Sequence, residues 1–252
     1  MHSGGRWSWL CLAAAHWVPA RAAASSAAPA DVATAWPSWA VLVAFALVPV
    51  MLMVTTSYLK ISVVLSLLRN ALGVTAVPSG VVVAALSALL TFYVMAPVAT
   101  QVQARVVATL AEDGPAQAPR LNLPQLASLW RAAEPPWRRF LQRNAGKRER
   151  TLFHTLAKER TQGGVSTLRI AADSWWVLLP AFIITELKEA FQIAFLLFVP
   201  FVIIDLVVMN VIMVLGMQGL APSTFSIPIK LLLFVVVDGW WLVTQALVLG
   251  YR

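Results

Sequence analysis

Long apolar segments occupy both ends of the chain, and one polar stretch separates them. The apolar segments cover 38–59, 81–98 and most of 174–252. The first two are each close to the roughly 20 residues that a helix needs to cross a bilayer, and the third is long enough for several such helices. A short break at 78–80 between the first two predicts an antiparallel helical hairpin. The pattern predicts an all-α fold of membrane-associated helical hairpins, with a polar helical domain inserted between two hydrophobic halves.

Four segments follow from this pattern. They are a signal-peptide-like segment and linker (1–37), an N-terminal hydrophobic hairpin (38–99), a polar basic domain (100–173) and C-terminal hydrophobic helices with a loop (174–252). In the first segment, Ala20-Arg21-Ala22 follows a short apolar run and fits a signal-peptide cleavage site. A mis-assigned start codon is the alternative.

Prolines and glycines predict where helices bend or end. Pro49 is expected to kink the first helix, and Gly73 is expected to end its continuation. Pro180 is expected to open the central helix, and Pro200 to separate or kink it from the next. Lys60 is expected at or beyond one membrane face.

The central stretch, 180–217, places charges in an apolar helix, where each costs at least about 2.5 kcal/mol at mid-membrane depth. At about 100° per residue, one arc of roughly 160° holds several polar side chains. The arc consists of Thr185, Glu186, Lys188, Glu189 and Gln192. Asp205 and Asp238 are further acids in apolar surroundings. These residues predict either an internally paired buried cluster or a subunit contact or transport path.

Composition supports a membrane protein. Sixty per cent of the residues are hydrophobic and only 12% are charged, whereas soluble domains are about a quarter charged. The net charge of +8 is concentrated in 100–173, which holds twelve Lys/Arg and six Asp/Glu. Basic and aromatic residues there are compatible with nucleic acid or anionic lipid, but no nucleic-acid motif accompanies them, so an amphipathic helix that packs on its neighbours is preferred.

No catalytic chemistry is predicted. The single cysteine, Cys11, and three widely spaced histidines offer no disulfide, metal or cofactor site. P-loop, GxSxG and HExxH motifs are absent from the sequence. Lys60 and Ser62 point to different helix faces, which argues against a serine–lysine hydrolase. Glu186 and Glu189 share a face, so a proton-carrying pair in an ion-coupled transporter is an alternative function.

Charge distribution leaves two orientations. The positive-inside rule would put the basic middle domain in the cytoplasm, but that rule is reliable only for loops shorter than about 60 residues. Lys60 and Arg69, interpreted as flanking the short hairpin loop, place that end inside and the middle domain outside. We favour the second orientation, and a cleaved signal peptide argues the same way.

Five stretches together resemble one family. They are TTSYLKISVVLSLLRNALGV (55–74), LLTFYVMAPV (89–98), PAFIITELKEAFQIAFLL (180–197), PFVIIDLVVMNVIMVLGM (200–217) and SIPIKLLLFVVVDGWWL (226–242). In order and spacing they look like the FliP/SctR (YscR/HrcR) family, a core subunit of the type III secretion export apparatus. The polar segment at 134–159 is also similar to that family's polar domain.

The resemblance implies a non-enzymatic, channel-forming subunit that passes unfolded proteins across the bacterial inner membrane. Implied partners are four further copies of itself, a small two-helix subunit, a larger single-copy subunit, the export-gate platform protein and secreted proteins in transit. The assembly would lie largely on the periplasmic side. An injectisome is favoured over a flagellar system because of the Gln after the LGM motif and the IPIK sequence.

Two positions depart from the family pattern. Ala194 stands where the family has glycine, a small-for-small change. The family's channel gasket is a run of methionines after the LGM motif, whereas here the corresponding residues are Met217, Gln218 and Gly219. Met217 is therefore the expected sealing residue of this loop.

Overall fold

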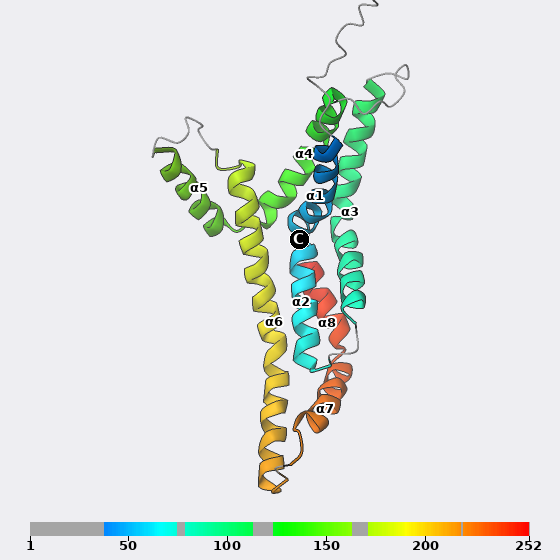
Figure 1. Ribbon diagram of the computed structural model, residues 1–252, viewed down its shortest axis with the longest axis vertical. Coiled ribbons are helices and arrows are strands. Elements are labelled where there is room, and N and C mark those ends of the chain that lie inside the picture. The colour runs from blue at the N-terminus through cyan, green and yellow to red at the C-terminus, as the bar shows by residue number, and fades with distance from the viewer. Residues whose placement is uncertain (1–37, 75–78, 113–122, 163–170, 218, 252) are drawn as a thin grey trace, which may run out of the picture. The chain divides into compact units, whose positions relative to one another are not determined.

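The computed structural model describes residues 38–74, 79–112, 123–162, 171–217 and 219–251. Its helices are α1 (Ser38–Thr55), α2 (Tyr58–Leu72), α3 (Gly80–Glu112), α4 (Leu123–Asn144), α5 (Lys147–Gln162), α6 (Trp175–Val214), α7 (Ser223–Val236) and α8 (Gly239–Leu249) (Figure 1). No strand occurs in these ranges, so the all-α prediction is confirmed. The signal-like segment lies outside the described residues.

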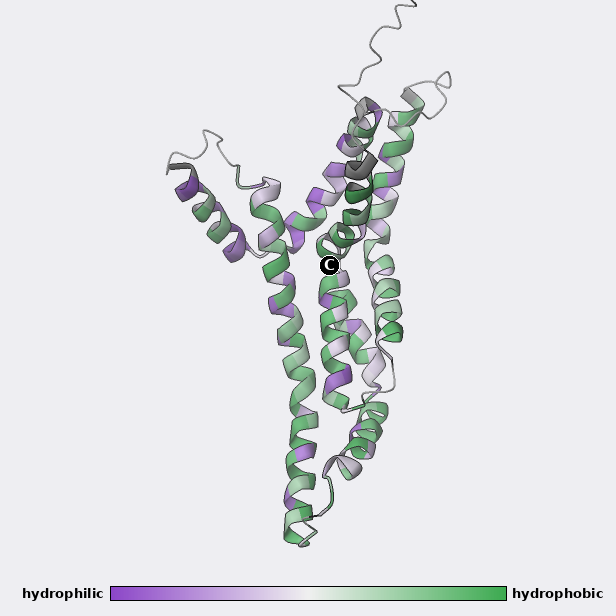
Figure 2. Cartoon of the chain, viewed as in Figure 1, coloured by the Kyte–Doolittle hydropathy of each residue, from purple (hydrophilic) through white to green (hydrophobic). Residues whose placement is uncertain are grey.

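Two compact parts divide the chain after Ala46, within α1. All packing described below lies within 47–252. Two helices of the described residues are long and apolar enough to cross a membrane, Gly80–Ala111 and Trp175–Val214, and the number rises to four if each bent helix pair counts as one span. Apolar residues dominate α3 and α6, whereas polar residues gather on α4 and α5 (Figure 2). These helices support a membrane location.

Helix α2 lies at the centre of the main core, packed against α3 and α6. The core is formed chiefly by Ile61, Val64 and Leu68 of α2, together with Val243 and Leu247 of α8. Helix α8 reaches this core because the chain bends by 63° after α7.

Gly239 begins α8 at that bend. A Cβ at this position would overlap the ring of Phe234, against which Trp240 packs edge-on at 5.3 Å between ring centroids. Only glycine therefore allows the two helices to approach so closely.

A second core joins the polar segment to the hydrophobic helices. Phe140 and Leu141 of α4 pack against Leu178 and Phe182 of α6. Helix α4 also packs on α3, and α5 packs on α6. The segment boundary placed at 99/100 falls inside α3, whereas that at 173/174 falls just before α6.

Several helix limits differ from the expected ones. Helix α6 begins at Trp175 and continues through Pro180 and Pro200, so these residues neither open nor end it. A proline removes one helical hydrogen bond, whereas a helix end leaves about four backbone groups without partners, at a greater cost in apolar surroundings.

The first hydrophobic segment breaks at Thr56-Ser57, not at Pro49. A bend of 71° separates its two helices there, and the hydroxyls of Thr55 and Thr56 donate to the carbonyls of Met51 and Leu52 at 2.6 and 2.7 Å. These threonines satisfy carbonyls at the helix end, which favours a break at this point. The end of α2 at Gly73, with φ +74°, is as predicted.

Candidate functional site

A buried charge cluster lies where α2 crosses the first half of α6. Lys60 Nζ is 2.6 Å from Glu189 Oε2 and 3.4 Å from Glu186 Oε2. The side chains of Lys60 and Glu186 are 1% and 0% exposed, whereas that of Glu189 is 43% exposed. We call Lys60, Glu186, Glu189 and Tyr251 the junction cluster.

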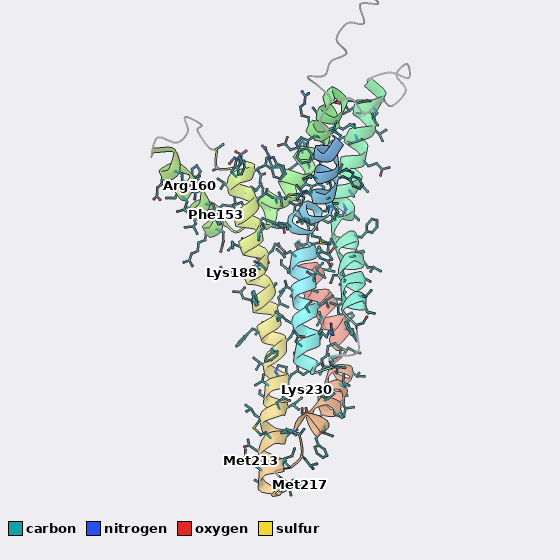
Figure 3. All side chains as sticks on the ribbon, viewed as in Figure 1. Phe153, Arg160, Lys188, Met213, Met217 and Lys230 are labelled. Carbon is teal, nitrogen blue, oxygen red and sulfur yellow. The ribbon has the colours of Figure 1, made fainter. Side chains whose placement is uncertain are left out.

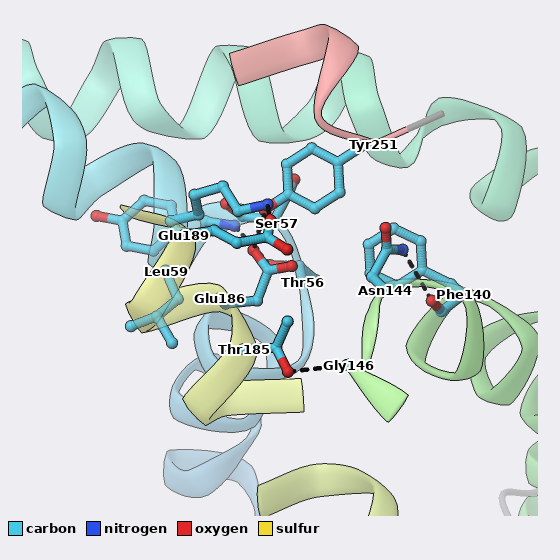
Figure 4. Close-up of polar contacts among 12 residues, drawn as sticks. Thr56, Ser57, Leu59, Phe140, Asn144, Gly146, Thr185, Glu186, Glu189 and Tyr251 are labelled. Atoms are coloured by element: carbon cyan, nitrogen blue, oxygen red, sulfur yellow. Dashed lines mark hydrogen bonds and ion pairs between the residues drawn. The ribbon is translucent and has the colours of Figure 1, made fainter. Parts of the chain in front are cut away.

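Tyr251 closes the junction cluster from the C-terminal end of the chain (Figure 4). Its hydroxyl donates to Glu186 Oε2, and the Lys60 ammonium lies 4.1 Å from the centre of its ring. The ring also stacks on Phe140 of α4, with centroids 6.1 Å apart. Tyr251 thereby connects α2, α4 and α6.

The junction cluster contains two carboxylates and one ammonium. Among the described residues, Glu186 Oε1 and the Ser57 hydroxyl are buried without a hydrogen-bond partner. Desolvated charges are stable only when they are paired and hydrogen-bonded. The half-exposed Glu189 can accept a further cationic or hydrogen-bonding partner from outside this chain.

A second ion pair lies about 28 Å further along α6, at a rise of 1.5 Å per residue. Lys230 of α7 is 2.6 Å from Asp205 Oδ2 and donates to the carbonyl of Ala71 at 3.3 Å. Lys230 is 6% exposed and Asp205 is 43% exposed. This pair holds α7 against α6 and the end of α2, and it again leaves a carboxylate accessible.

The predicted polar arc is divided between two sides of α6. Lys188 faces α5, where its ammonium is 3.3 Å from Glu149 Oε1. A hydrogen bond from the backbone of Glu149 lowers the pKa of the Glu149 carboxyl below its ordinary value of 4.5, and the Lys188 ammonium lowers it further. Gln192 is exposed on the same side as Lys188, so neither residue belongs to the junction cluster.

Thr185 fixes the turn between α4 and α5 against α6. It accepts a hydrogen bond from the Gly146 amide at 2.9 Å and donates to Ala181 O at 2.7 Å. A Cβ on Gly146 would collide with Glu149 and crowd Thr185. A larger residue at position 146 would therefore require the Glu149 carboxylate to move and would press on the Thr185 hydroxyl.

An open apolar groove of about 890 Å³ lies along the middle of α6, over residues 188–198. It is lined by Leu67, Lys188, Phe191, Gln192, Ala194, Phe195, Leu196 and Phe198. Phe195 and Leu196 are 68% and 71% exposed. Contiguous exposed apolar surface of this kind marks contact with lipid or another protein.

Methionines follow one another at the end of α6. Met209 and Met213 lie on the helix and Met217 just beyond it, all exposed. Figure 3 labels Met213 and Met217 at this end of α6. Gly216, with φ +71°, turns the chain, and Gly219 is exposed with open space where a Cβ would be. Gln218 lies outside the described residues.

Asp238 is separate from both ion pairs. It precedes α8 at the bend after α7, with φ +50°, and its side chain is exposed. Asp tolerates this left-handed backbone better than most residues do. In the isolated chain it does not contribute to a buried cluster.

Sequence reasoning missed Lys60 and Tyr251. The structure buries Lys60 of α2 against α6, and its position at a membrane face stays a prediction. The available signal was an excess of acids on α6, namely Glu186, Glu189 and Asp205, over its one cation, Lys188. Within the described ranges, no group of three His, Cys, Asp or Glu side chains is arranged to hold a metal ion.

Comparison with known proteins supplies independent information. The pattern of the FliP family matches residues 41–247. The chain is 42% identical to "Hypersensitivity response secretion protein HrcR" of Ralstonia nicotianae, over 83% of this chain and 94% of that protein. It is 37% identical to "Yop proteins translocation protein R" of Yersinia pestis, over 84% and 94%. It is 40% identical to "Flagellar biosynthetic protein FliP" of Pectobacterium carotovorum subsp. carotovorum, over 82% and 74%.

Proposed function

The chain belongs to the FliP family, and we propose that it is a channel-forming subunit of a type III protein-export gate. The names of its relatives describe secretion, translocation and flagellar biosynthesis. Its role in this proposal is structural and not enzymatic. The gate passes unfolded secreted proteins across the bacterial inner membrane.

One observation carries the assembly part of this proposal: the second half of α6 has few partners within its own chain. It exposes large apolar side chains along the groove, together with the half-exposed carboxylate of Asp205. Neighbouring copies, five in all by family resemblance, would cover this surface. The small two-helix subunit, the larger single-copy subunit and the platform protein complete the proposed partners.

Assembly is tested by purifying the tagged chain from cells that express its neighbouring export genes. The proposal requires a defined complex with several copies of this chain. Ion-coupled transport by the purified single chain in liposomes would instead favour a stand-alone transporter, with Glu186 and Glu189 as the proton-carrying pair.

The gate part of the proposal concerns the loop after α6. Met217 is the third residue after the end of α6, and Gly219 adds no apolar bulk. Methionine is unbranched and adaptable, so several thioethers around one axis can close a narrow opening and still part for a passing chain. A hydrophobic constriction also excludes ions by dewetting.

Ion leakage through the resting complex tests this gate. Met217→Ala should raise the leak without reducing assembly, and Gly219→Met in the same background should lower it again. Met213→Ala, which shortens an exposed methionine still inside α6, is the matched control. Equal conductance of wild type and Met217→Ala at equal complex levels would show that Met217 does not form part of the gate.

The proposed orientation places the polar segment on the periplasmic side. Burial of Lys60 removes one of the two charges on which this orientation rested, whereas Arg69 remains next to the α2–α3 loop. A reporter that is active only outside the cytoplasm, fused near residue 163, should be active. Activity of a cytoplasmic reporter at the same point would reverse the orientation.

We favour an injectisome over a flagellar system. The chain covers 94% of the two secretion and translocation relatives but 74% of the Pectobacterium flagellar protein. The flagellar protein of Bacillus subtilis is covered over 96% of its length, so a flagellar paralogue is the second candidate. Complementation of matched deletion strains distinguishes them: an injectisome subunit restores effector secretion but not motility.

A further inference from the structure

A cavity of about 390 Å³ lies between α2, α3 and α8, away from both ion pairs of α6. Its wall is formed by Leu65, Leu68, Leu72, Val82, Val83, Leu86, Trp240 and Thr244, with Arg69 as its one charged lining residue. Pockets of this size commonly hold small ligands through apolar contact and a few placed polar groups. A single cation beside an apolar wall fits a ligand with an anionic head and an apolar tail.

The opening of the cavity lies at the exposed side chains of Val82 and Trp240. Arg69 is in the last turn of α2, and its guanidinium lies 3.5 Å from the position that a Cβ on Gly80 would take. Gly80 is the first residue of α3, so the positive end of that helix dipole adds to the charge of the guanidinium. The one charged lining residue of the cavity therefore lies beside the start of α3, whereas the rest of the wall is uncharged.

The same end of the helices has the composition of a membrane interface. The end of α2 lies next to α7, where Gly73 approaches Ile227, and α3 packs against α8 (Figure 1). Trp240 and Trp241 are 48% and 63% exposed there, beside the exposed Asp238. Exposed tryptophans next to charged residues are typical of the headgroup level of a bilayer, which puts lipid phosphates within reach of Arg69.

We propose that this cavity binds one anionic phospholipid, with its phosphate on Arg69 and an acyl chain between α2, α3 and α8. The guanidinium offers a planar pair of donors that matches a phosphate. The apolar wall accepts the chain irrespective of headgroup, so selectivity for anionic lipid depends on Arg69. A bound lipid would fill the space that the described side chains of α2, α3 and α8 leave open.

Native mass spectrometry of the purified export complex tests this site. Dioleoyl phosphatidylglycerol and dioleoyl phosphatidylcholine are titrated separately. We expect tighter binding of phosphatidylglycerol, and a loss of about tenfold in its affinity in Arg69→Gln, as for a charge-assisted contact. Arg105→Gln, which removes an exposed arginine of α3, should leave both affinities unchanged.

A second pair of variants tests the cavity itself. Val82→Trp plugs the mouth at a half-exposed position, so it should fold normally and lose phosphatidylglycerol binding. Val81→Trp changes the adjacent residue, which is 79% exposed and does not line the cavity, and should bind as wild type. Equal affinity for the two lipids, equal effects of Arg69→Gln and Arg105→Gln, or unchanged binding in Val82→Trp would each overturn the proposal. So would a wild-type complex without bound lipid, which would mean that a neighbouring subunit fills the cavity.

Discussion

The two halves of α6, 175–190 and the longer 191–214, differ in where they find contacts, and the second half is the more apolar of the two. In the first half, Val177, Leu178, Ala181, Phe182, Thr185, Glu186 and Ala190 are buried by α2, α4 and α5; in the second half, the buried residues are Ala194, Phe201, Val208 and Ile212. Large apolar side chains such as Leu196 stay exposed in the second half. Hydrophobicity alone therefore does not determine burial in this chain, because the elements available to cover a helix also decide it. The first half of α6 is covered by other helices of the same chain, whereas the second half exposes an apolar surface for lipid or another subunit.

The largest expected effect comes from removing the buried cation of the first half. Lys60→Met leaves Glu186 buried without its ammonium partner, which should cost about 3–5 kcal/mol of folding free energy. Unfolding in denaturant, followed by circular dichroism, measures this loss. Adding Glu186→Gln should recover most of it, because the remaining carboxylate, Glu189, is half-exposed and can be hydrated. Wild-type stability of Lys60→Met would show that the junction cluster does not hold the first half of α6.

A matched pair of leucines compares the two halves directly. Leu178 is 0% exposed and Leu196 is 71% exposed. Leu178→Ala should destabilise the chain by about 3 kcal/mol through lost burial and a cavity, whereas Leu196→Ala should change its stability by less than about 0.5 kcal/mol. In the assembled complex, Leu196→Ala should instead reduce recovery of the oligomer. Equal losses of stability from both substitutions in the isolated chain would show that the two halves do not differ in how much their packing stabilises it.

A smaller effect is expected at the ion pair of the second half. Asp205→Asn leaves the buried Lys230 with the carbonyl of Ala71 and a neutral amide, at a cost of about 1–3 kcal/mol. Thermal unfolding of the purified chain measures it. Asp238→Asn is the control, because it removes an exposed acid at a position whose left-handed backbone Asn also tolerates. An Asp205→Asn variant as stable as this control would mean that the pair does not hold α7 in place.

Hydrophobic pattern predicted the fold class and the separation of polar and apolar segments, because helix period and span length are local properties of the sequence. The prediction of helix limits at the prolines of α6 was wrong. A helix continues through a proline where one lost hydrogen bond costs less than a helix end, and that comparison depends on the surroundings. The polar arc predicted that Glu186 would be sheltered. It did not predict that Lys60, more than a hundred residues away, is the partner, because that contact depends on how α2 and α6 pack. Nor did any local pattern point to Tyr251, which reaches the junction cluster only after α7 and α8 have folded back.

The smallest expected effect is a pH dependence at the α5–α6 contact, at the boundary between the two halves. The folded-state pKa of Glu149 lies below 4.5, its ordinary value, because of its own backbone amide and Lys188. A lowered carboxyl pKa stabilises the fold fully above 4.5, and this contribution disappears as the pH falls through the folded-state pKa. The difference in unfolding free energy between wild type and Glu149→Gln should therefore be constant from pH 8 to about pH 5.5 and shrink towards zero in more acid solution.

A measurement at high salt and a control substitution at a second glutamate make this test more specific. The pair is partly solvated, with Lys188 53% exposed, so 1 M salt should reduce the difference at neutral pH. Glu159→Gln removes an exposed carboxylate from the same helix, and the effect of Glu149→Gln should exceed it above pH 5.5. A difference that grows as the solution is acidified would contradict the sign, because it would mean that the protonated carboxyl, and not the ion pair with Lys188, holds α5 against α6.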